Sequence, residues 1–352
     1  MTLNEVIERI RPADLPARAA ARQRWDAVAH PLESLGLLEE AIVRIAGVQE
    51  TAAVDISKRA VVAMCADNGV VAEGVTQSGQ DVTAIVTENM ARGASSVCCM
   101  GRLAGAEVWP VDIGVTVPVK GERILQRNIR RGTANLAVGP AMTREECERA
   151  VLTGVEIAGD LAAQGNRLLL TGEMGIGNTT TSAAVASVLL DRDPVDMTGR
   201  GAGLSSEGLT KKIDAIRRGI AVNHPDPADP LDVVQKVGGL DIAGLVGVFL
   251  GGALHRVPVL VDGFISSVAA LVAARLCPAS VDAMLASHAS GEPAGRMVLD
   301  ELGLEPPISA GMRLGEGTGA VALLPLLDMA LAVYREMVSF EDTAIEAYEH
   351  LT

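Results

Sequence analysis

The sequence predicts an α/β protein with a parallel sheet that helices cover on both faces. Short, nearly continuous apolar segments rich in β-branched residues alternate with longer segments of helical periodicity. Strands buried on both faces have this apolar character, and parallel strands need long crossover connections between them. Hydrophobic residues make up 49% of the 352 residues, which is enough for a deep core. A chain of this length forms one large domain with a smaller appendage, or two domains.

Five segments are predicted as strands, in the order in which they occur. Each is short and apolar, and a polar or glycine-containing segment follows most of them. The predicted strands cover residues 60–65, 108–111, 167–170, 257–261 and 281–285.

Helices are predicted before and between these strands. The first residues, to about residue 46, are Ala-rich and charged, and Thr143 with Glu146 forms a capping box at the start of a later helix. The apolar segment 242–254 is too short to span a membrane, so we expect a buried helix there and no membrane span. The remaining predicted helices cover residues 143–164, 180–190, 209–221, 265–276 and 318–337, and the proline-rich segment 225–230 is predicted as an exposed loop.

Charge and cysteine content exclude several classes of protein. The formal net charge of -14 argues against a nucleic-acid partner, because phosphate backbones need a basic surface. Residues 1–11 carry two glutamates and no apolar core, so we expect no secretory signal peptide and a cytoplasmic location. The five cysteines form no CxxC pair and are expected to be buried and reduced, although the neighbours Cys98 and Cys99 could form a redox-active pair. The dispersed histidines predict no metal site.

Polar side chains follow all five predicted strands. Ligands of open parallel sheets bind outside the carboxyl ends of the strands, so these side chains are expected to form one rim. Each carboxylate could instead cap the helix that follows it, but five polar strand ends together favour a binding site. They are Asp67 with Asn68, Asp112, Glu173, Asp262, and Ser287 with His288.

Two glutamates lie in glycine-rich loops. Glu316 is flanked by Gly315 and Gly317, and Glu173 directly follows Gly172. Glycine permits positive φ angles and lets a ligand approach the backbone closely. A carboxylate that a ligand shields from water becomes a stronger proton acceptor. The two loops are therefore expected to form one site, with Glu316 as a candidate base.

The segment 172–177 is a candidate phosphate loop. It has the two outer glycines of a Walker A motif, but Asn178 occupies the position of the lysine, so a nucleoside triphosphate is not expected. A glycine loop between a strand and a helix, with Asn178 and Thr179 near the helix start, is suited to a single phosphate. A structural β-turn is the alternative.

Three further residues are candidates for phosphate binding. Lys212 and Arg313 are the basic residues most suited to point inward, although both could be ordinary surface charges. Ser290 precedes Gly291 and is either a phosphate donor or a helix N-cap.

The motifs together resemble the nicotinate-nucleotide–dimethylbenzimidazole phosphoribosyltransferase family. The resemblance extends from about residue 66 to residue 320 and rests on Glu173 with the GIGNTT loop, Asp262-Gly263-Phe264, Ser287-His288-x-Ser290-x-Glu292 and the segment 312–320. It implies a three-layer, Rossmann-like parallel sheet, a small helical domain formed from both termini, and a homodimer. The corresponding division of the chain is 1–46, 47–320 and 321–352.

The resemblance also implies a reaction and roles for residues. The 5-phosphoribosyl group of nicotinate mononucleotide would pass to 5,6-dimethylbenzimidazole or a related base, giving α-ribazole 5′-phosphate and nicotinate, in assembly of the nucleotide loop of cobalamin. Glu316 would remove the benzimidazole proton, and Glu173 would lie near the ribose and its anomeric carbon. The phosphate would be held by Gly175, Gly177, Lys212, Ser290 and Arg313, and the other expected substrate-binding residues are Asn178, Thr179, Asp262, Gly263, Leu314 and Gly315.

The chemistry needs no metal or cofactor, because the positively charged pyridinium ring of the nucleotide departs as nicotinate, whose pyridine ring is neutral. Two segments depart from the family pattern: Gln77-Ser78-Gly79, which should flank the base pocket, and Asp67-Asn68-Gly69 in place of Asp-His-Gly. Small changes in a flat apolar pocket discriminate by only about 1–3 kcal/mol. A different benzimidazole, a purine or a phenol therefore stays open as the acceptor. A non-catalytic nucleotide-binding protein on the same fold is the alternative from another functional class.

Overall fold

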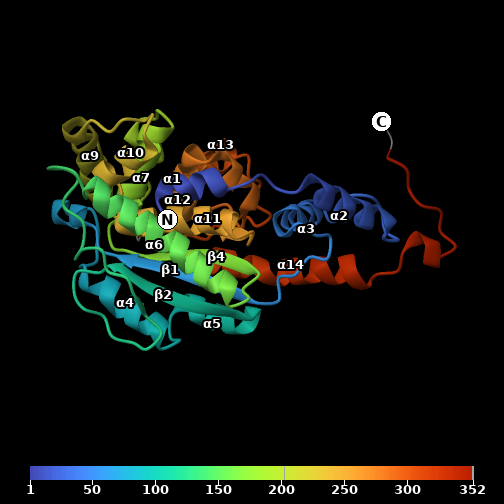
Figure 1. Ribbon diagram of the computed structural model, residues 1–352. Coiled ribbons are helices and arrows are strands. Elements are labelled where there is room, and N and C mark those ends of the chain that lie inside the picture. Colours follow the sequence, from blue (N-terminus) through green and yellow to red (C-terminus); the bar gives the residue numbers. More distant parts are fainter. Residues whose placement is uncertain (202, 351–352) are drawn as a thin grey trace.

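Six parallel strands form a single sheet in this computed structural model, which describes residues 1–201 and 203–350 (Figure 1). Their order is β3-β2-β1-β4-β5-β6, and every neighbouring pair is parallel. The order reverses direction between β1 and β4, so a ligand crevice is expected above their carboxyl ends. The strands are β1 (Arg59–Ala66), β2 (Ala106–Gly114), β3 (Leu125–Gln126), β4 (Leu168–Met174), β5 (Val259–Val261) and β6 (Met284–Ala286).

Helices cover both faces of this sheet, as the sequence predicts. All eight residues of β1 are buried, and they alternate between two apolar cores. Ala60, Val62 and Met64 pack into one core, whereas Val61, Ala63 and Cys65 pack into the other. This alternation follows from the two-residue period of a strand. The predicted three-layer α/β architecture is therefore confirmed.

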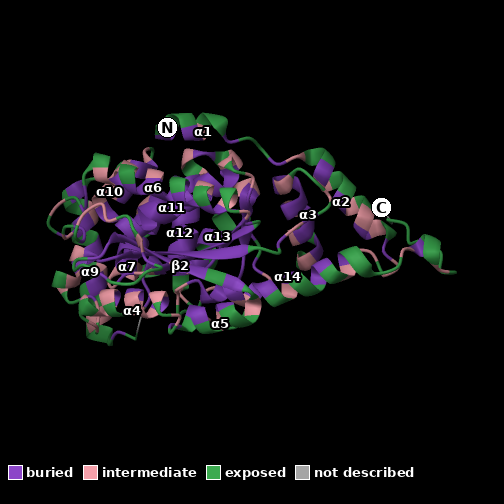
Figure 2. Ribbon diagram, turned by 60° about the horizontal axis from the view of Figure 1, so that its bottom comes forward, coloured by how far each residue is buried: buried purple, intermediate pink, exposed green. Residues whose placement is uncertain are grey.

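The larger core lies beneath the helices of the first face, where α11 and α6 are in extensive contact. The helix α11 is buried over almost its whole length, as expected from its apolar sequence (Figure 2). The helices of this face and its edge are α1 (Leu3–Arg9), α6 (Arg144–Ala163), α7 (Asn178–Leu189), α8 (Pro194–Met197), α9 (Ser206–Asn223), α10 (Pro230–Val237), α11 (Leu240–Leu254), α12 (Phe264–Leu276) and α13 (Pro293–Glu301).

The opposite face and a helical extension share the second core. Helices α4 (Asp81–Ala91), α5 (Ser96–Ala104) and the first half of α14 (Thr318–Glu336) lie against the sheet. Helices α2 (Leu15–Ala27) and α3 (Leu37–Gln49) pack together and, with the second half of α14, extend to one side of the body (Figure 1). Segments from near both ends of the sequence thus pack together in this extension, while α1 rests on α6 and α11.

Several elements differ from the sequence-based expectation. Residues 278–283 form the 3-10 helix η2 (Pro278–Ala283), so β6 begins three residues later than the predicted strand 281–285. Proline at the first position of η2 fixes the φ angle that this turn needs, which the strand pattern does not reveal. The sequence also did not predict β3, α4, α5, α10 or α13. The two remaining 3-10 helices are η1 (Gly69–Glu73) and η3 (Phe340–Asp342).

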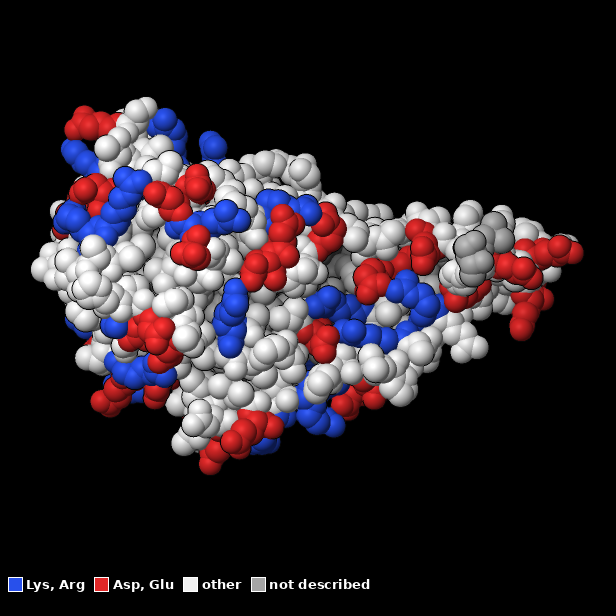
Figure 3. All heavy atoms as spheres, turned by 90° about the horizontal axis from the view of Figure 1, so that it is seen from above, with Lys and Arg blue, Asp and Glu red and all other residues white. Residues whose placement is uncertain are grey.

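The surface charges and the apolar helix α14 are relevant to the expectations of no nucleic-acid partner and no membrane span. Acidic and basic side chains are interspersed on the face seen in Figure 3, which carries no extended basic field. Among the described residues, only α14 is long and apolar enough for a membrane span, and 56% of its apolar 18-residue stretch is buried within the protein. Length and composition alone are weak support for a span, because a core helix meets the same criteria. Four cysteines are buried, but Cys99 on α5 is exposed, contrary to the expectation for it.

Candidate active site

A cavity of about 310 Å³ lies beyond the carboxyl ends of β4, β5 and β6. Its walls come from the loops after these strands, from the starts of α7 and α12, from α9, and from the loop before α14. Every residue to which the family resemblance gives a role lines it: Glu173, Gly175, Gly177, Asn178, Thr179, Lys212, Asp262, Gly263, Ser290, Arg313, Leu314, Gly315 and Glu316. Thr76, Gln77 and Ser78 also line it, as the expected flank of a base pocket should.

Only part of the predicted polar rim reaches this cavity. Glu173, Asp262 and His288 line it, whereas Asp67 and Asp112 do not. The Asp112 carboxylate accepts a hydrogen bond from the backbone N–H of Val115 at 2.9 Å and pairs with Arg131 at 3.3 Å. Likewise, Asp67 accepts from the backbone N–H of Thr116 at 2.8 Å. Both carboxylates thus bind the protein's own groups, although neither caps the helix that follows it, and the expectation of five converging strand ends was wrong.

The loop around Glu316 has the backbone geometry that its glycines predict. Gly315, Glu316 and Gly317 have φ angles of 86°, 63° and 99°. Positive φ is uncommon for a residue with a side chain, so the conformation of Glu316 is held by its surroundings. A side-chain carbon at Gly315 would collide with Oε1 of Glu173. Glycine at this position thus lets the two glutamate loops meet, as predicted.

Asp262 anchors the same loop from the end of β5. Its Oδ2 accepts a hydrogen bond from the N–H of Gly317 at 3.1 Å, and its Oδ1 accepts from the N–H of Ala320 at 3.0 Å. These are N–H groups at the start of α14, which no side chain of its own N-cap residue satisfies. Asp262 therefore caps α14 from a distant part of the chain and fixes the entry to the Glu316 loop.

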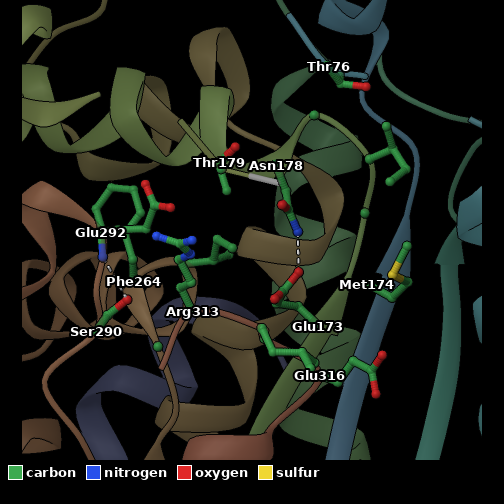
Figure 4. Close-up of a pocket in the computed structure, with 18 of the residues that line it drawn as sticks. Thr76, Glu173, Met174, Asn178, Thr179, Phe264, Ser290, Glu292, Arg313 and Glu316 are labelled. Atoms are coloured by element: carbon green, nitrogen blue, oxygen red, sulfur yellow. Dashed lines mark hydrogen bonds between the residues drawn. The ribbon is translucent and has the colours of Figure 1, made fainter. Parts of the chain in front are cut away.

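The Glu316 carboxylate is held at the start of another helix. Its Oε2 accepts a hydrogen bond from the N–H of Val97 at 3.1 Å, in the first turn of α5. The partial positive charge of a helix N-terminus attracts a carboxylate. Figure 4 shows the Glu316 carboxylate on the Met174 side of Glu173, and Arg313 on the opposite side. The cavity therefore has two chemically different ends with Glu173 between them.

Glu173 is a strongly perturbed carboxyl group. It is only 7% exposed, and the side-chain amide of Asn178 donates a hydrogen bond to its Oε2. Burial, together with the negative charges of Asp241 and Asp262, raises the pKa of Glu173 to about 8, against the effect of the Asn178 hydrogen bond. Near neutral pH, Glu173 therefore exchanges readily between its charged and neutral forms.

The other end of the cavity contains a buried cation. Lys212 is 1% exposed, and its Nζ donates to the hydroxyl of Thr179 at 2.8 Å and to the carbonyl of Gly199 at 3.1 Å. No carboxylate of the described residues lies within ion-pair distance of it, and burial lowers its pKa to about 8. An ammonium group has three N–H donors, so one donor is left for a ligand. Such a site favours an anion.

Two further features of this end favour an anion. The helix α7 begins after Gly177, whose φ is 96°, and no side chain caps it in the described structure. The N–H groups of Asn178 and Thr180 donate to the carbonyls of Gly175 and Gly177 at 3.0 and 2.9 Å, so in the first turn the N–H of Thr179 is the one left for a phosphate among the described residues. Ser290, Glu292 and Arg313 lie on the same side of the cavity (Figure 4). The hydroxyl of Ser290 also accepts a hydrogen bond from the N–H of Glu292 at 3.3 Å, so it helps to begin α13 as well.

Sequence reasoning missed several residues that line the cavity. Val86 on α4, Met174 at the end of β4, and Arg200 and Leu204 before α9 belong to this group. Met174 lies directly beside Glu173, so its position at a predicted strand end was a usable signal. The other three come from elements or loops that carry no motif.

Known proteins are similar to this chain in both sequence and fold. A family model described as phosphoribosyltransferase matches residues 10–345. A nicotinate-nucleotide–dimethylbenzimidazole phosphoribosyltransferase from Acetivibrio thermocellus is 47% identical over 328 residues, covering 93% of each chain. The enzyme of that name from Ruminiclostridium cellulolyticum is 45% identical over 351 residues, covering 100% of each chain. The chain belongs to the nicotinate-nucleotide–dimethylbenzimidazole phosphoribosyltransferase family.

Solved structures agree with this assignment. The crystal structure of CobT from Thermus thermophilus superimposes with a TM-score of 0.90, at 39% identity, and the match covers 95% of this chain and 100% of that one. A second structure from the same organism, titled as the phosphoribosyltransferase, gives a TM-score of 0.89 at 40% identity. The resemblance seen in the sequence is confirmed, and so is the fold it implies.

Proposed function

We propose that the protein transfers the 5-phosphoribosyl group of nicotinate mononucleotide to 5,6-dimethylbenzimidazole, the reaction for which its relatives are named. The products are α-ribazole 5′-phosphate and nicotinate, and the reaction belongs to assembly of the nucleotide loop of cobalamin. The observation that carries this proposal is the contact between the two glutamate loops, in which Gly315 leaves room for Glu173. A base and a ribose-facing carboxylate then share one cavity with an anion site.

The Glu316 end of the cavity is suited to the acceptor base. Thr76 and Met174 lie at this end (Figure 4), and Val75 and Val86 add apolar surface from the adjacent segments. A flat aromatic ring fits such a wall. As one ring nitrogen of the benzimidazole attacks the anomeric carbon, the N–H on the other nitrogen becomes acidic, and Glu316 accepts that proton. General-base catalysis of this kind contributes roughly 10²- to 10⁴-fold in rate.

The opposite end is suited to the nucleotide phosphate. Lys212, Arg313 and Ser290 supply donors from side chains, while Gly175 and Gly177 let the phosphate approach the backbone before α7. Glu173 then lies beside the ribose. Its ionised form stabilises the positive charge that develops on the sugar as nicotinate leaves. Attack from the face opposite nicotinate converts the β-nucleotide into an α-product.

The remaining cavity residues support these groups. Asn178 holds Glu173, Thr179 holds Lys212, and Asp262 holds the start of α14. Gly263 and Leu314 complete the wall around the ribose. No metal or cofactor enters this scheme, because a neutral pyridine ring leaves without acid assistance.

We also propose a homodimer in the cytoplasm, with the chain divided into a large α/β domain over 47–320 and a small helical domain over 1–46 and 321–352. Support comes from the extension formed by α2, α3 and α14, in which segments from near both ends of the sequence pack together. Its exposed surface includes Leu37, Met329 and Val338, whose apolar side chains a partner subunit would cover.

Product analysis tests the proposed reaction. The protein is incubated with nicotinate mononucleotide and, in separate reactions, with 5,6-dimethylbenzimidazole, other benzimidazoles, adenine and phenols. We expect release of nicotinate together with an α-linked riboside phosphate, fastest with a benzimidazole. Binding of the mononucleotide without nicotinate release under any acceptor would establish a non-catalytic nucleotide-binding protein instead.

Two variants locate the base. Glu316→Gln should lower turnover by about 10²- to 10⁴-fold while the mononucleotide still binds. Glu301→Gln is the matched control, because Glu301 forms a surface ion pair with Arg275 outside the cavity. Full activity of Glu316→Gln would exclude Glu316 as the base.

A further inference from the structure

His288 lines the active-site cavity but has no role in the reaction proposed for it. It lies two residues after the end of β6 and is 3% exposed. Its ring packs against the first turn of α14, where a side-chain carbon at Gly319 would collide with Nδ1. Glycine at this position leaves room for the ring, so the backbone of α14 holds the imidazole in one place.

The hydrogen bonds of Ser287 determine which ring nitrogen of His288 carries the proton. The hydroxyl oxygen of Ser287 lies 2.6 Å from the carbonyl oxygen of Val261 and 3.0 Å from Nδ1 of His288. Two oxygens this close need a proton between them, and a hydroxyl group has only one to donate. The hydroxyl therefore donates to Val261, and Nδ1 donates to the hydroxyl. In the neutral ring Nε2 is then unprotonated and can only accept a hydrogen bond.

This Nε2 atom faces the cavity without a partner. No described residue donates a hydrogen bond to it, and it is not fully shielded from the cavity that His288 lines. A side-chain carbon at Gly263 would lie 3.8 Å from Nε2 and 3.9 Å from Oγ of Ser290, so both atoms border the space that this glycine leaves open. Burial lowers the pKa of His288, against the effect of the negative charge of Asp262, so the ring is neutral near pH 7. A histidine with a structural role alone would have both nitrogens paired within the protein.

An unprotonated ring nitrogen selects a ligand group that donates a hydrogen bond. A phosphate dianion and a carboxylate offer only acceptors, so neither the phosphate nor the carboxylate of nicotinate mononucleotide can pair with Nε2. The donors of that nucleotide above pH 7 are the 2′- and 3′-hydroxyls of its ribose. The 3′-carbon is the closer of the two to the phosphate along the sugar, whereas the 2′-carbon is bonded to the anomeric carbon. Since Ser290 lies with Arg313 at the phosphate end of the cavity (Figure 4), Nε2 beside it is on the 3′ side.

We propose that His288 is a specificity-determining residue, whose Nε2 accepts a hydrogen bond from the 3′-hydroxyl of the nucleotide and so distinguishes ribose from 3′-deoxyribose. The inference rests on the proposed function, because it takes nicotinate mononucleotide as the ligand. Glu173 then faces the other side of the sugar, where the anomeric carbon lies. Three groups of the cavity thus hold three parts of one nucleotide: the anion site, His288 and Glu173.

Binding of deoxy analogues tests the inference by isothermal titration calorimetry without an acceptor base. His288→Asn keeps an N–H donor near the position of Nδ1 but has no atom at Nε2, whereas His288→Gln places an amide oxygen near Nε2. One neutral hydrogen bond corresponds to a factor of about 2 to 12 in affinity. The wild type should bind 3′-deoxy nicotinate mononucleotide more weakly than the ribonucleotide by this factor. His288→Asn should bind the two equally, and His288→Gln should keep part of the difference.

The matched control is His224→Asn, because His224 is exposed at the end of α9, outside the cavity, and its φ of 46° is one that asparagine adopts readily. It should discriminate as the wild type does. The 2′-deoxy analogue should show the same relative affinity in the wild type and in all three variants. A structural role alone would weaken the ribonucleotide and both analogues equally in His288→Asn. Discrimination against the 3′-deoxy analogue that persists in His288→Asn, or that the wild type lacks, would overturn the inference.

Nitrogen-15 NMR of the wild type gives a second readout that needs no variant to fold. The ring signals of His288 are assigned through their bonds to the backbone. Nε2 should have the chemical shift of an unprotonated nitrogen, which should move when nicotinate mononucleotide binds and not when the 3′-deoxy analogue binds. A protonated Nε2 in the free protein near pH 7 contradicts the inference.

The two readouts also separate this inference from the proposed function. If the mononucleotide binds but no nicotinate is released with any acceptor, the proposed transfer fails, and the affinity ratios still decide the role of His288. If nicotinate is released while the ratios do not depend on His288, the inference fails and the proposed function stands.

Discussion

Replacement of Lys212 by methionine tests the anion site most sharply. The chain provides its own control, because Lys211 is the next residue on α9, with 57% of its side chain exposed and an ion pair to Glu207 at 2.9 Å. Lys211→Met removes the same charge from the same helix, 3.8 Å away along the backbone. Only Lys212 faces the cavity.

The expected loss of binding follows from the donors of Lys212. Two of its three N–H groups bind Thr179 and Gly199, which leaves one for a phosphate oxygen. A hydrogen bond to a charged group contributes about 1.5–3 kcal/mol. Each 1.4 kcal/mol corresponds to a tenfold change, so nicotinate mononucleotide should bind about 10- to 150-fold more weakly to Lys212→Met. Lys211→Met should bind it as the wild type does.

Lys212→Met should weaken ligand binding, but it should not lower the folding stability of the protein. Burial lowers the pKa of Lys212 to about 8, so the folded state carries the full cost of its charge below that pH. The cost decreases as the pH rises from about 8 toward the ordinary value for lysine. Below pH 8, Lys212→Met should therefore unfold with equal or higher free energy, by at most about 3 kcal/mol. A loss of binding then cannot be attributed to unfolding.

The assay is isothermal titration calorimetry with nicotinate mononucleotide, together with urea unfolding at pH 7. Wild-type affinity in Lys212→Met would refute the phosphate assignment. An equal loss in Lys211→Met would show that the general field of α9, rather than the buried donor, attracts the ligand.

Three further predictions concern the carboxylates and the glycine between them. Because burial raises the pKa of Glu173 to about 8, kcat should rise as the pH increases toward 8. Between about pH 4.5 and 8 the folded state also binds one more proton at Glu173 than the unfolded state does, so the wild type loses stability as the pH rises through this range. Urea unfolding should therefore show Glu173→Gln gaining stability relative to the wild type over the same range. Gly315→Ala should nearly abolish turnover, since its side chain meets Glu173, whereas Gly311→Ala, at φ 64° with open space around it, should retain turnover in the same nicotinate-release assay. Asp262→Asn keeps only one acceptor oxygen for two N–H groups, so thermal or urea unfolding should show a loss of about 1–3 kcal/mol, and unchanged stability would contradict its capping role.

The sequence was sufficient to predict many of the residues that line the cavity, for identifiable physical reasons. Apolar segments bounded by polar residues located the carboxyl ends of the strands, where ligands of parallel sheets bind. Glycines beside Glu316 marked a loop with positive φ, and Gly315 and Gly317 have it, whereas Gly172 and Gly175 beside Glu173 do not. The same reasoning misjudged Asp112, because the sequence does not distinguish a strand-end carboxylate that faces a ligand from one that accepts a hydrogen bond from the protein's own backbone.

The contacts that set the chemistry could not be predicted. Glu316 accepts its hydrogen bond from Val97, 219 residues earlier in the chain, on a helix that the sequence pattern did not predict. Asp241 occurs at the start of an apolar helix that was expected only to be buried. Its proximity to Asn68 and Gly175 depends on how α11 packs beneath β1, which is a property of the assembled sheet. Pairings between distant segments carry no local signal.

The most direct test of the account compares two acceptors in the wild type and in Glu316→Gln. 5,6-Dimethylbenzimidazole must lose a proton when it attacks the ribose, whereas 1-methylbenzimidazole attacks with its free nitrogen and has no N–H to lose. Nicotinate release is measured at saturating nicotinate mononucleotide. We predict that Glu316→Gln loses about 10²- to 10⁴-fold in rate with the first acceptor and almost nothing with the second. An equal loss with both acceptors would contradict the assignment of Glu316 as the base.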